Sequence, residues 1–264
     1  MKWNAKGTRV YYIESDRGYK TTALHMADAR TGKDSVLLQE RSDTYVAPSP
    51  ILRPVGNGET VIWSSERDGW NHLYLVDGNG GGIKRQLTSG PWVVFDVAHV
   101  DADARWVYFT AGGRETGRDP YYRHLYRTSL DGGEPQLLTP EDADHSIGFS
   151  PTGNYFVDTY SRMDLPPVSR LRRADGKQVR ELQRADIAAL LTTGWRVPER
   201  FTFKARDGVT DLYGVILRPS NFDPERKYPV LDAIYPGPQI VSTPKSFSPA
   251  GYMEIGRASC RERV

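Results

Sequence analysis

The sequence predicts a mainly β protein, a partial β-propeller followed by the opening strands of an α/β domain. A strand pattern that returns four times indicates the propeller, and an apolar run near the C-terminus indicates the second domain. The composition agrees with this prediction, since the 264 residues include 25 Gly, 18 Pro, 15 Tyr and 6 Trp. A composition so rich in turn-forming and aromatic residues argues against a coiled coil, a collagen or a disordered chain.

The repeated unit is an apolar-aromatic strand, a charged turn, a second strand ending in Asp, a Gly turn and a short strand ending in Thr. Its first strand begins at Val10, Val61, Val107 and Tyr155, so successive copies are 51, 46 and 48 residues apart. A period near 50 residues with about four short strands is typical of a propeller blade. Four hairpins of a β-sandwich are the alternative architecture, and the regular spacing favours the propeller.

Asp-Gly pairs punctuate the repeats at 68–69, 77–78, 131–132 and 175–176. We expect each pair to supply the positive φ that a tight hairpin requires. Because propellers generally have four to eight blades, the four copies predict part of a larger ring over residues 1–192.

The pattern changes after the fourth copy. Residues 184–192 predict a short helix and residues 194–198 a linker, and two alternating strands then flank a turn at Asp207-Gly208. The run V-L-D-A-I-Y at 230–235 is almost wholly apolar, which predicts a strand buried on both faces of a central sheet. We therefore expect a second domain over residues 193–254.

The last ten residues, 255–264, read I-G-R-A-S-C-R-E-R-V and resemble the translation of a common sequencing adapter. We interpret them as a processing artefact and leave them out of the fold argument; a genuine basic tail is the alternative. They contain three Arg and one Glu, so without them the formal charge of +2 falls to about zero. They also contain Cys260, the one cysteine of the sequence.

The composition without residues 255–264 excludes several classes of binding partner and site. A chain near neutrality gives no indication of nucleic-acid binding, and no apolar run approaches the roughly 18 residues of a membrane span. Without a cysteine before residue 255, a disulfide framework, a cysteine metal site and a cysteine nucleophile are excluded there. The sequence predicts no cofactor and no metal site.

Two motifs of the second domain carry a resemblance to a known family. F-x-x-x-D-G-x-x-x-L-x-G-x-x-x-x-P begins at Phe203, and K-Y-P-V-L-x-x-x-Y-x-G-P begins at Lys227. Together they resemble the start of the α/β-hydrolase domain of the prolyl oligopeptidase family. The blade motif S-E-R-D-G-W-x-H-L-Y resembles the propeller of its dipeptidyl-peptidase-IV-like subfamily. The resemblance implies a seven- or eight-bladed propeller over a serine peptidase domain with a Ser, Asp and His triad.

The triad itself is not found in this sequence. A nucleophile elbow would read G-x-S-x-G, and the nearest string, G-F-S-P-T-G at 148–153, has the wrong spacing and lies among the blades. We expect the histidines at 25, 72 and 124 to pack inside blades and those at 99 and 145 to lie in blade connections. The resemblance assigns one catalytic residue, Tyr235 of the Y-x-G-P motif, whose hydroxyl would help to stabilise the oxyanion. A buried sheet aromatic is the alternative for Tyr235.

The sequence offers one candidate residue for substrate binding, Tyr45. Tyr45 precedes A-P-S-P, near where the family places an aromatic side chain that lines the substrate cavity, so the resemblance implies substrate binding. The family's acidic pair for the substrate amino terminus has no counterpart, and we interpret Glu14, Glu66 and Glu115 as solvated turn residues. The loops at 67–70 and 114–120 could line a pore, but hairpin tips are the favoured interpretation.

We therefore hypothesise that the chain is a piece of a serine exopeptidase. The enzyme would cleave short peptides with a specificity of the proline type, and the propeller would control substrate entry. On this hypothesis the 264-residue chain is inactive alone, because the triad is absent from it. The partner is a peptide substrate, and a homodimeric parent protein and the cellular compartment are left open. A non-catalytic propeller that binds protein or carbohydrate is the alternative function.

Overall fold

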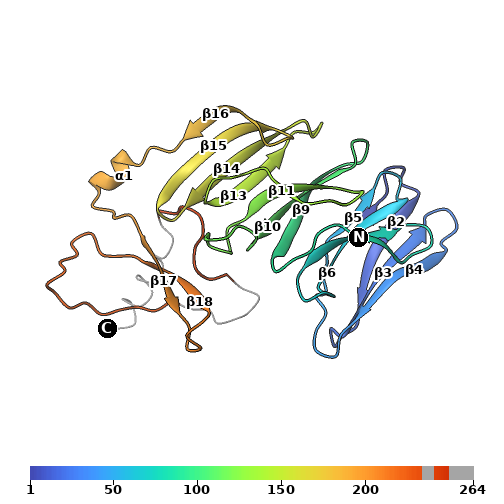
Figure 1. Ribbon diagram of the computed structural model, residues 1–264, viewed down its shortest axis with the longest axis horizontal. Coiled ribbons are helices and arrows are strands. Elements are labelled where there is room, and N and C mark those ends of the chain that lie inside the picture. Colours follow the sequence, from blue (N-terminus) through green and yellow to red (C-terminus); the bar gives the residue numbers. More distant parts are fainter. Residues whose placement is uncertain (234–240, 250–264) are drawn as a thin grey trace.

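The computed structural model describes residues 1–233 and 241–249, and these form four successive antiparallel sheets and a separate hairpin (Figure 1). Each of the four sheets has four strands in simple meander order, so each is one propeller blade. The strands are β1 (Lys2–Trp3), β2 (Arg9–Ser15), β3 (Thr21–Asp28), β4 (Asp34–Arg41), β5 (Leu52–Val55), β6 (Thr60–Ser65), β7 (His72–Asp77), β8 (Ile83–Gln86), β9 (Val93–Asp101), β10 (Trp106–Gly112), β11 (His124–Ser129), β12 (Gln136–Leu137), β13 (Asp144–Phe149), β14 (Tyr155–Arg162), β15 (Leu165–Arg173) and β16 (Gln178–Arg184).

The repeat predicted from the sequence matches the structure with a shift of one strand. The predicted first strands are β2, β6, β10 and β14, and each is the second strand of its blade. Each blade begins instead with β1, β5, β9 or β13, which the pattern did not reveal. Consequently His99 and His145 lie in strands β9 and β13, and their predicted place in blade connections is wrong.

Three of the four predicted Asp-Gly turns have the expected backbone. Gly69, Gly132 and Gly176 have φ of 97°, 90° and 86°, in the left-handed region that only glycine adopts at low cost. The turn after Asp77 differs, because its left-handed residues are Gly81 and Gly82, with φ of 77° and 83°. The longer loop that joins β7 to β8 therefore moves the positive φ three residues along the chain.

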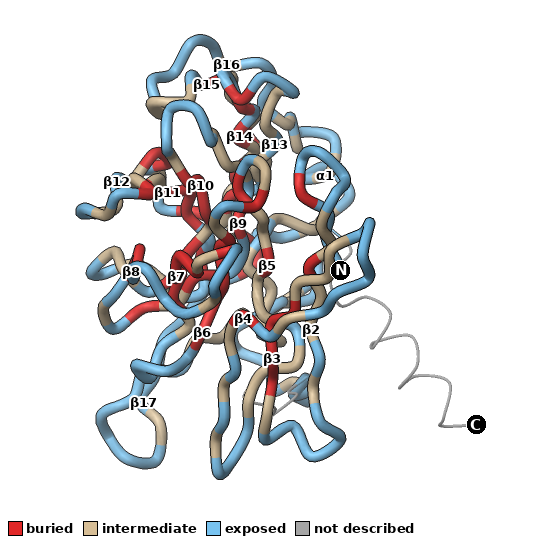
Figure 2. The backbone as a smooth tube through the Cα atoms, turned by 90° about the vertical axis from the view of Figure 1, so that its right-hand side faces the viewer, coloured by how far each residue is buried: buried red, intermediate tan, exposed pale blue. Residues whose placement is uncertain are grey.

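Blades pack face to face through alternating side chains. On β6, Ile62 lies in the apolar cluster shared with the third blade, whereas Val61 and Trp63 lie in the cluster shared with the first. On β10, Phe109 likewise belongs to the cluster with the second blade, and Tyr108 to the cluster with the fourth. A period of two thus places successive side chains on opposite faces. Figure 2 shows that burial is concentrated on these middle strands.

The second unit follows a five-residue helix, α1 (Ala188–Thr192), which is shorter than the predicted 184–192, since β16 continues to Arg184 and residues 185–187 are not helical. The predicted two-stranded hairpin is confirmed as β17 (Glu199–Lys204) and β18 (Asp211–Ile216), with Gly208 at φ 70° in its turn. Among the described residues, no helix is long and apolar enough to cross a membrane.

The predicted buried strand at 230–235 is not formed where the structure describes it. Residues 230–233 have no strand pairing, and Val230 and Leu231 are 89% and 64% exposed. An apolar run becomes a buried strand only when neighbouring strands and helices cover both of its faces. No such neighbours cover residues 230–233 within the described part of the chain.

One end of the blades, here called the lower face, carries two kinds of connection between strands. It carries the second-to-third strand connections of the four blades, at 16–20, 66–71, 113–123 and 163–164. Because connections alternate between the two ends of a meander, the links between blades, such as 42–51, emerge there too. The chain also leaves β16 at this end, and the β17–β18 hairpin lies below the third and fourth blades (Figure 1).

Candidate functional site

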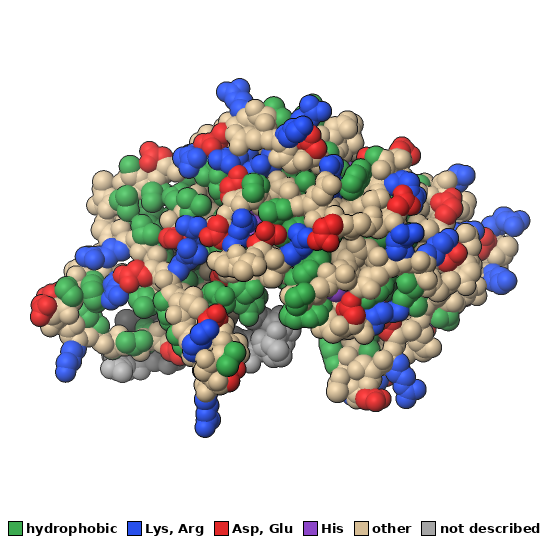
Figure 3. All heavy atoms as spheres, in the orientation of Figure 1, with side chains coloured by type: hydrophobic (Ala, Val, Ile, Leu, Met, Phe, Trp, Pro, Cys, Tyr) green, Lys and Arg blue, Asp and Glu red, His purple; other side chains and the backbone are tan. Residues whose placement is uncertain are grey.

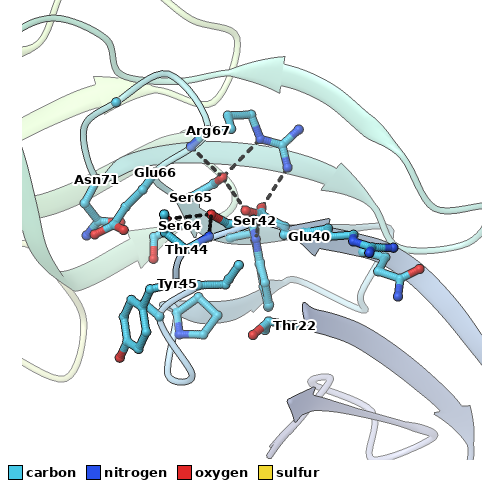
Figure 4. Close-up of a pocket in the computed structure, with 17 residues that line it drawn as sticks. Thr22, Glu40, Ser42, Thr44, Tyr45, Ser64, Ser65, Glu66, Arg67 and Asn71 are labelled. Atoms are coloured by element: carbon cyan, nitrogen blue, oxygen red, sulfur yellow. Dashed lines mark hydrogen bonds and ion pairs between the residues drawn. The ribbon is translucent and has the colours of Figure 1, made fainter. Parts of the chain in front are cut away.

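A polar cavity of about 570 Å³ opens on the lower face between the first and second blades. Its walls come from the ends of β3, β4 and β6, from the link after β4 and from the connection after β6. Figure 4 shows Tyr45 and Glu66 among its lining residues. In the space-filling view of Figure 3, a separate notch at the lower edge of the molecule lies between the hairpin and the lower end of the first blade.

A hydrogen-bonded network centred on Glu40 forms one wall of this cavity. One oxygen of Glu40 accepts hydrogen bonds from Trp63 Nε1 at 2.8 Å and Arg67 Nη2 at 2.7 Å. Its other oxygen accepts a hydrogen bond from Ser65 Oγ at 2.7 Å. The Arg67 guanidinium also lies 5.0 Å from the ring centroid of Tyr74, whose pKa burial raises to about 12. Arg67 is therefore paired with Glu40 beside the cavity, while the connection that carries it is exposed at 66–70, as expected for a hairpin tip.

Tyr45 is presented to this cavity on a braced loop. Tyr45 is 56% exposed, and its ring centroid lies 6.0 Å from that of Tyr19, with the ring planes at an angle of 50°. Tyr19 has φ of 52°, which is unusual for a tyrosine and costs backbone energy. Its carbonyl accepts the amide of Val46 at 2.8 Å, and Lys20 Nζ donates to the carbonyls of Asp43, at 2.7 Å, and Thr44. The strained turn and the lysine together hold the loop that carries Tyr45.

The three glutamates considered in the sequence have different surroundings. Glu66 is exposed and lines the cavity, where it lies beside Asn71 in Figure 4. Glu14 pairs with His25 Nε2 at 2.9 Å on the first blade. Glu115 accepts the hydroxyl of Tyr126 at 2.8 Å. Glu66 is therefore the one of the three whose carboxylate faces a cavity on the lower face.

A second cavity, of about 500 Å³, lies between the third blade and the hairpin. Its walls are the connection at 113–123, parts of β17 and β18, and residues 243–245. Within them Arg200 donates to the hydroxyl of Tyr122 at 2.7 Å and pairs with Asp164 at 3.2 Å. Lys245 pairs with Asp119 at 2.7 Å. The loop at 114–120 is thus a docking element for the second unit, and its interpretation as a solvated hairpin tip is wrong.

Histidines do not gather into a catalytic group in the described residues. The expected packing of His25, His72 and His124 inside blades is confirmed, since each is at most 7% exposed. His72 has both ring nitrogens bonded, to Thr88 Oγ1 at 3.0 Å and to the carbonyl of Gly90 at 2.8 Å. His72 thus satisfies polar groups between strands.

One cluster has the residue types of a metal site, because ligand atoms of Glu141, His145 and Asp158 lie within 4.8 Å of one another. However, Arg172 donates to Asp158 at 2.9 Å and to Glu141 at 2.6 Å. His145 faces two acceptors, Asp158 at 2.7 Å and the carbonyl of Glu141 at 3.0 Å. These partners occupy both nitrogens of His145, both oxygens of Asp158 and one oxygen of Glu141, so within the described residues Glu141 Oε2 is the one ligand atom of the cluster without a hydrogen bond. The cluster is an ionic network that stabilises the fourth blade.

Tyr235, the predicted oxyanion donor, lies outside the described residues. Sequence reasoning missed Glu40, Lys20 and Lys245, because each acts through a contact distant in sequence. Lys245 and Asp119, for example, are 126 residues apart. The position of Lys245 after the Y-x-G-P motif gave no indication that it reaches a propeller loop.

Comparisons with known proteins agree on one family. The sequence profile of the dipeptidyl peptidase IV N-terminal region matches residues 1–167. Dipeptidyl peptidase 4 of Arthroderma otae is 28% identical over 78% of this chain and 27% of its own length. The crystal structure of dipeptidyl peptidase 4 from Porphyromonas gingivalis superposes with a TM-score of 0.75 and 25% identity, covering 92% of this chain and 34% of that one.

A candidate dipeptidyl aminopeptidase IV from Bacteroides ovatus superposes with a TM-score of 0.76 and 27% identity, covering 96% of this chain and 39% of that one. The chain therefore spans about a quarter of the length of the curated relatives that it matches.

Proposed function

The chain belongs to the dipeptidyl peptidase IV family, and from that premise we propose that it is part of a serine exopeptidase that removes dipeptides from short peptides. Residues 1–192 would supply propeller blades and residues 193–254 the start of the α/β-hydrolase domain, with 255–264 foreign to both. The substrate would enter between the lower face and the hydrolase domain. The propeller would thereby restrict access to short peptides.

In this proposal Tyr235 donates a hydrogen bond to the oxyanion. A serine outside this sequence would attack the scissile carbonyl, its proton passing to a histidine and then to the leaving amine. Water would release the dipeptide from the acyl-enzyme. The negative charge that develops on the carbonyl oxygen would be held in part by the Tyr235 hydroxyl. The 264-residue chain would not hydrolyse peptides alone, because it contains no G-x-S-x-G elbow.

Tyr45 would contact the substrate from the propeller side. The observation that supports this most directly is its position, since an exposed aromatic ring on a braced loop lines a polar cavity on the lower face. The hairpin of the second unit lies on that same face (Figure 1). Tyr45 and the unit that would carry the chemistry thus lie at the same end of the blades.

The test begins with the contiguous reading frame of the gene and its expressed product. We expect a G-x-S-x-G elbow within roughly 100 residues, followed by Asp and then His. The product should cleave Gly-Pro and Ala-Pro chromogenic substrates. Tyr235→Phe should lower kcat by about 10²–10³-fold, as the loss of one oxyanion donor does. Tyr45→Ala should raise KM with little change in kcat.

A matched control is Tyr155→Ala, since Tyr155 is 44% exposed on the fourth blade and lines neither cavity. It should leave both kinetic constants unchanged. A frame without the elbow, or a product that binds protein or carbohydrate and cleaves neither substrate, would favour the alternative of a non-catalytic binding propeller. Gel filtration of the same product tests whether the parent protein is a homodimer.

A further inference from the structure

Lys245 is enclosed by charge and aromatic rings that come from two different parts of the chain. Its Nζ lies 2.7 Å from Asp119 Oδ2, and each of the two side chains is only 10% exposed. Nζ also lies 4.8 Å from the ring centroid of Tyr121 and 5.2 Å from that of Tyr213. We call Asp119, Tyr121 and Tyr213 the lysine cage.

The cage residues also contact one another directly. The second carboxylate oxygen of Asp119 accepts the backbone amide of Tyr121 at 3.0 Å, which orients both residues. The rings of Tyr121 and Tyr213 lie 6.0 Å apart at 81°, an edge-to-face arrangement that aromatic pairs favour. A desolvated ammonium gains from ring faces as well as from a carboxylate. Removing one charge would leave the other buried and unpaired.

The segment around Lys245 is fastened at two further points. Thr243 Oγ1 donates to the carbonyl of Tyr213 at 3.0 Å, and the amide of Phe247 donates to Ser161 Oγ at 3.1 Å. Tyr213 belongs to β18 and Ser161 to β14, so residues 243–247 connect the hairpin to the fourth blade while Lys245 reaches the third. Of these three contacts, the one made by Lys245 is charged.

Lys245 follows Tyr235 by ten residues in the sequence. We propose that the lysine cage anchors this segment to the propeller and that Lys245 is thereby a positioning residue for Tyr235 in the proposed peptidase reaction. The positioning half of this inference rests on the proposed function, whereas the anchoring half stands without it. The propeller would then do more than restrict entry, because its third blade would hold the segment beyond the oxyanion tyrosine.

Hydrogen exchange of the 264-residue chain tests the anchor. In Lys245→Met and in Asp119→Asn, amides within residues 241–249, including that of Phe247, should exchange at least about tenfold faster, because local opening no longer breaks a buried ion pair. Amides of β10 should keep their wild-type rates in both variants, which shows that the blades remain folded. Lys245→Arg keeps the cation and should restore most of the protection.

The matched control is Lys204→Met. Like Lys245, Lys204 pairs with an aspartate, in this case Asp211 of the second unit at 2.6 Å. The Lys204 side chain, however, is 56% exposed and lies outside the cage. Exchange within 241–249 should be unchanged in this variant. Equal acceleration in Lys204→Met and Lys245→Met, or no acceleration in Lys245→Met, would overturn the anchor.

Kinetics of the product of the contiguous gene test the positioning role. Lys245→Met should lower kcat by about 10–100-fold with KM nearly unchanged, since a misplacement of about 1 Å can cost that much. Lys245→Arg should recover most of the loss. A wild-type kcat in a variant whose segment exchanges faster would overturn the positioning role. If the wild-type product cleaves neither substrate, the proposed function fails, and the exchange experiment still decides the anchor.

Discussion

Acid should weaken this fold through a buried histidine, His124 on β11. Its side chain is 2% exposed, and its Nδ1 donates to the carbonyl of Thr139 at 3.0 Å. Its Nε2 is buried without a hydrogen-bond partner among the described residues. Burial, together with the charge of the neighbouring His145, lowers the pKa of His124 to about 4. No acceptor within the described part of the chain lies within hydrogen-bond reach of Nε2, and burial outweighs the distant charge of Glu115, so the folded protein keeps this ring neutral above about pH 4.

The magnitude follows from proton linkage. In the unfolded chain the ring titrates near its ordinary pKa of 6.5, so below that pH the unfolded state binds more protons than the folded one. Stability therefore falls as the pH falls from 6.5 towards 4, and the ring contributes no pH dependence above that range. The shift from 6.5 to about 4 corresponds to a loss of about 2 kcal/mol at pH 5 and about 3 kcal/mol once the pH is below 4.

The assay is urea unfolding followed by tryptophan fluorescence near pH 7.5, 6 and 5, on wild type and His124→Asn. The asparagine amide retains a donor for the Thr139 carbonyl but cannot titrate. The variant should lose a constant amount of stability to the smaller side chain and should lack the extra acid-dependent loss. Titrating groups that do not interact with His124 are common to both proteins and cancel in the difference, whereas the interaction with His145 is part of the effect that is measured. A difference that stays constant from pH 7.5 to 5 would refute the reasoning.

Two further substitutions test the packing of the blades. Asp158→Asn should cost about 3–5 kcal/mol in urea unfolding, because it removes the fully buried carboxylate that pairs with Arg172, which is 4% exposed and then keeps only Glu141 as a charged partner; a cost below 1 kcal/mol would contradict this. Gly58→Ala should cost about 1–3 kcal/mol more than Gly69→Ala, and equal costs would count against the packing argument. Both glycines have positive φ, but only at Gly58 would a Cβ collide with the Tyr11 hydroxyl, which donates to the Gly58 carbonyl at 2.9 Å.

The sequence predicted the blades well because their signal is local. An alternating run such as H-L-Y-L-V-D at 72–77 records which face each side chain takes, and β7 pairs with β6 in that register. The first strands of the blades gave a weaker signal. β5 is only four residues long and contains Pro54, and β9 has register shifts against β10 that interrupt alternation. Their short or bulged pairing with the next strand is a property of the sheet and cannot be recognised in one strand alone.

The site was harder to predict, because its contacts join distant segments. Arg67 has the sequence context of a hairpin tip, and only the folded chain places Glu40 beside it. The strain at Tyr19 is likewise invisible in the sequence, since a positive φ is expected at glycine and not at a tyrosine. Residue type indicates which side chains could take part in binding or catalysis, but only the folded structure shows which of them are already paired.

The lengths of the connections at the lower face show why function gathers there. The second-to-third strand connection is two residues long in the fourth blade, at 163–164, and eleven in the third, at 113–123. A blade needs only a tight turn at this point, so the extra residues of the third blade serve another purpose. In this structure they supply Asp119 and Tyr121, which hold Lys245 of the second unit. A repeat whose strands are fixed by packing can vary in such connections without loss of stability, and the longest one is where the second unit docks.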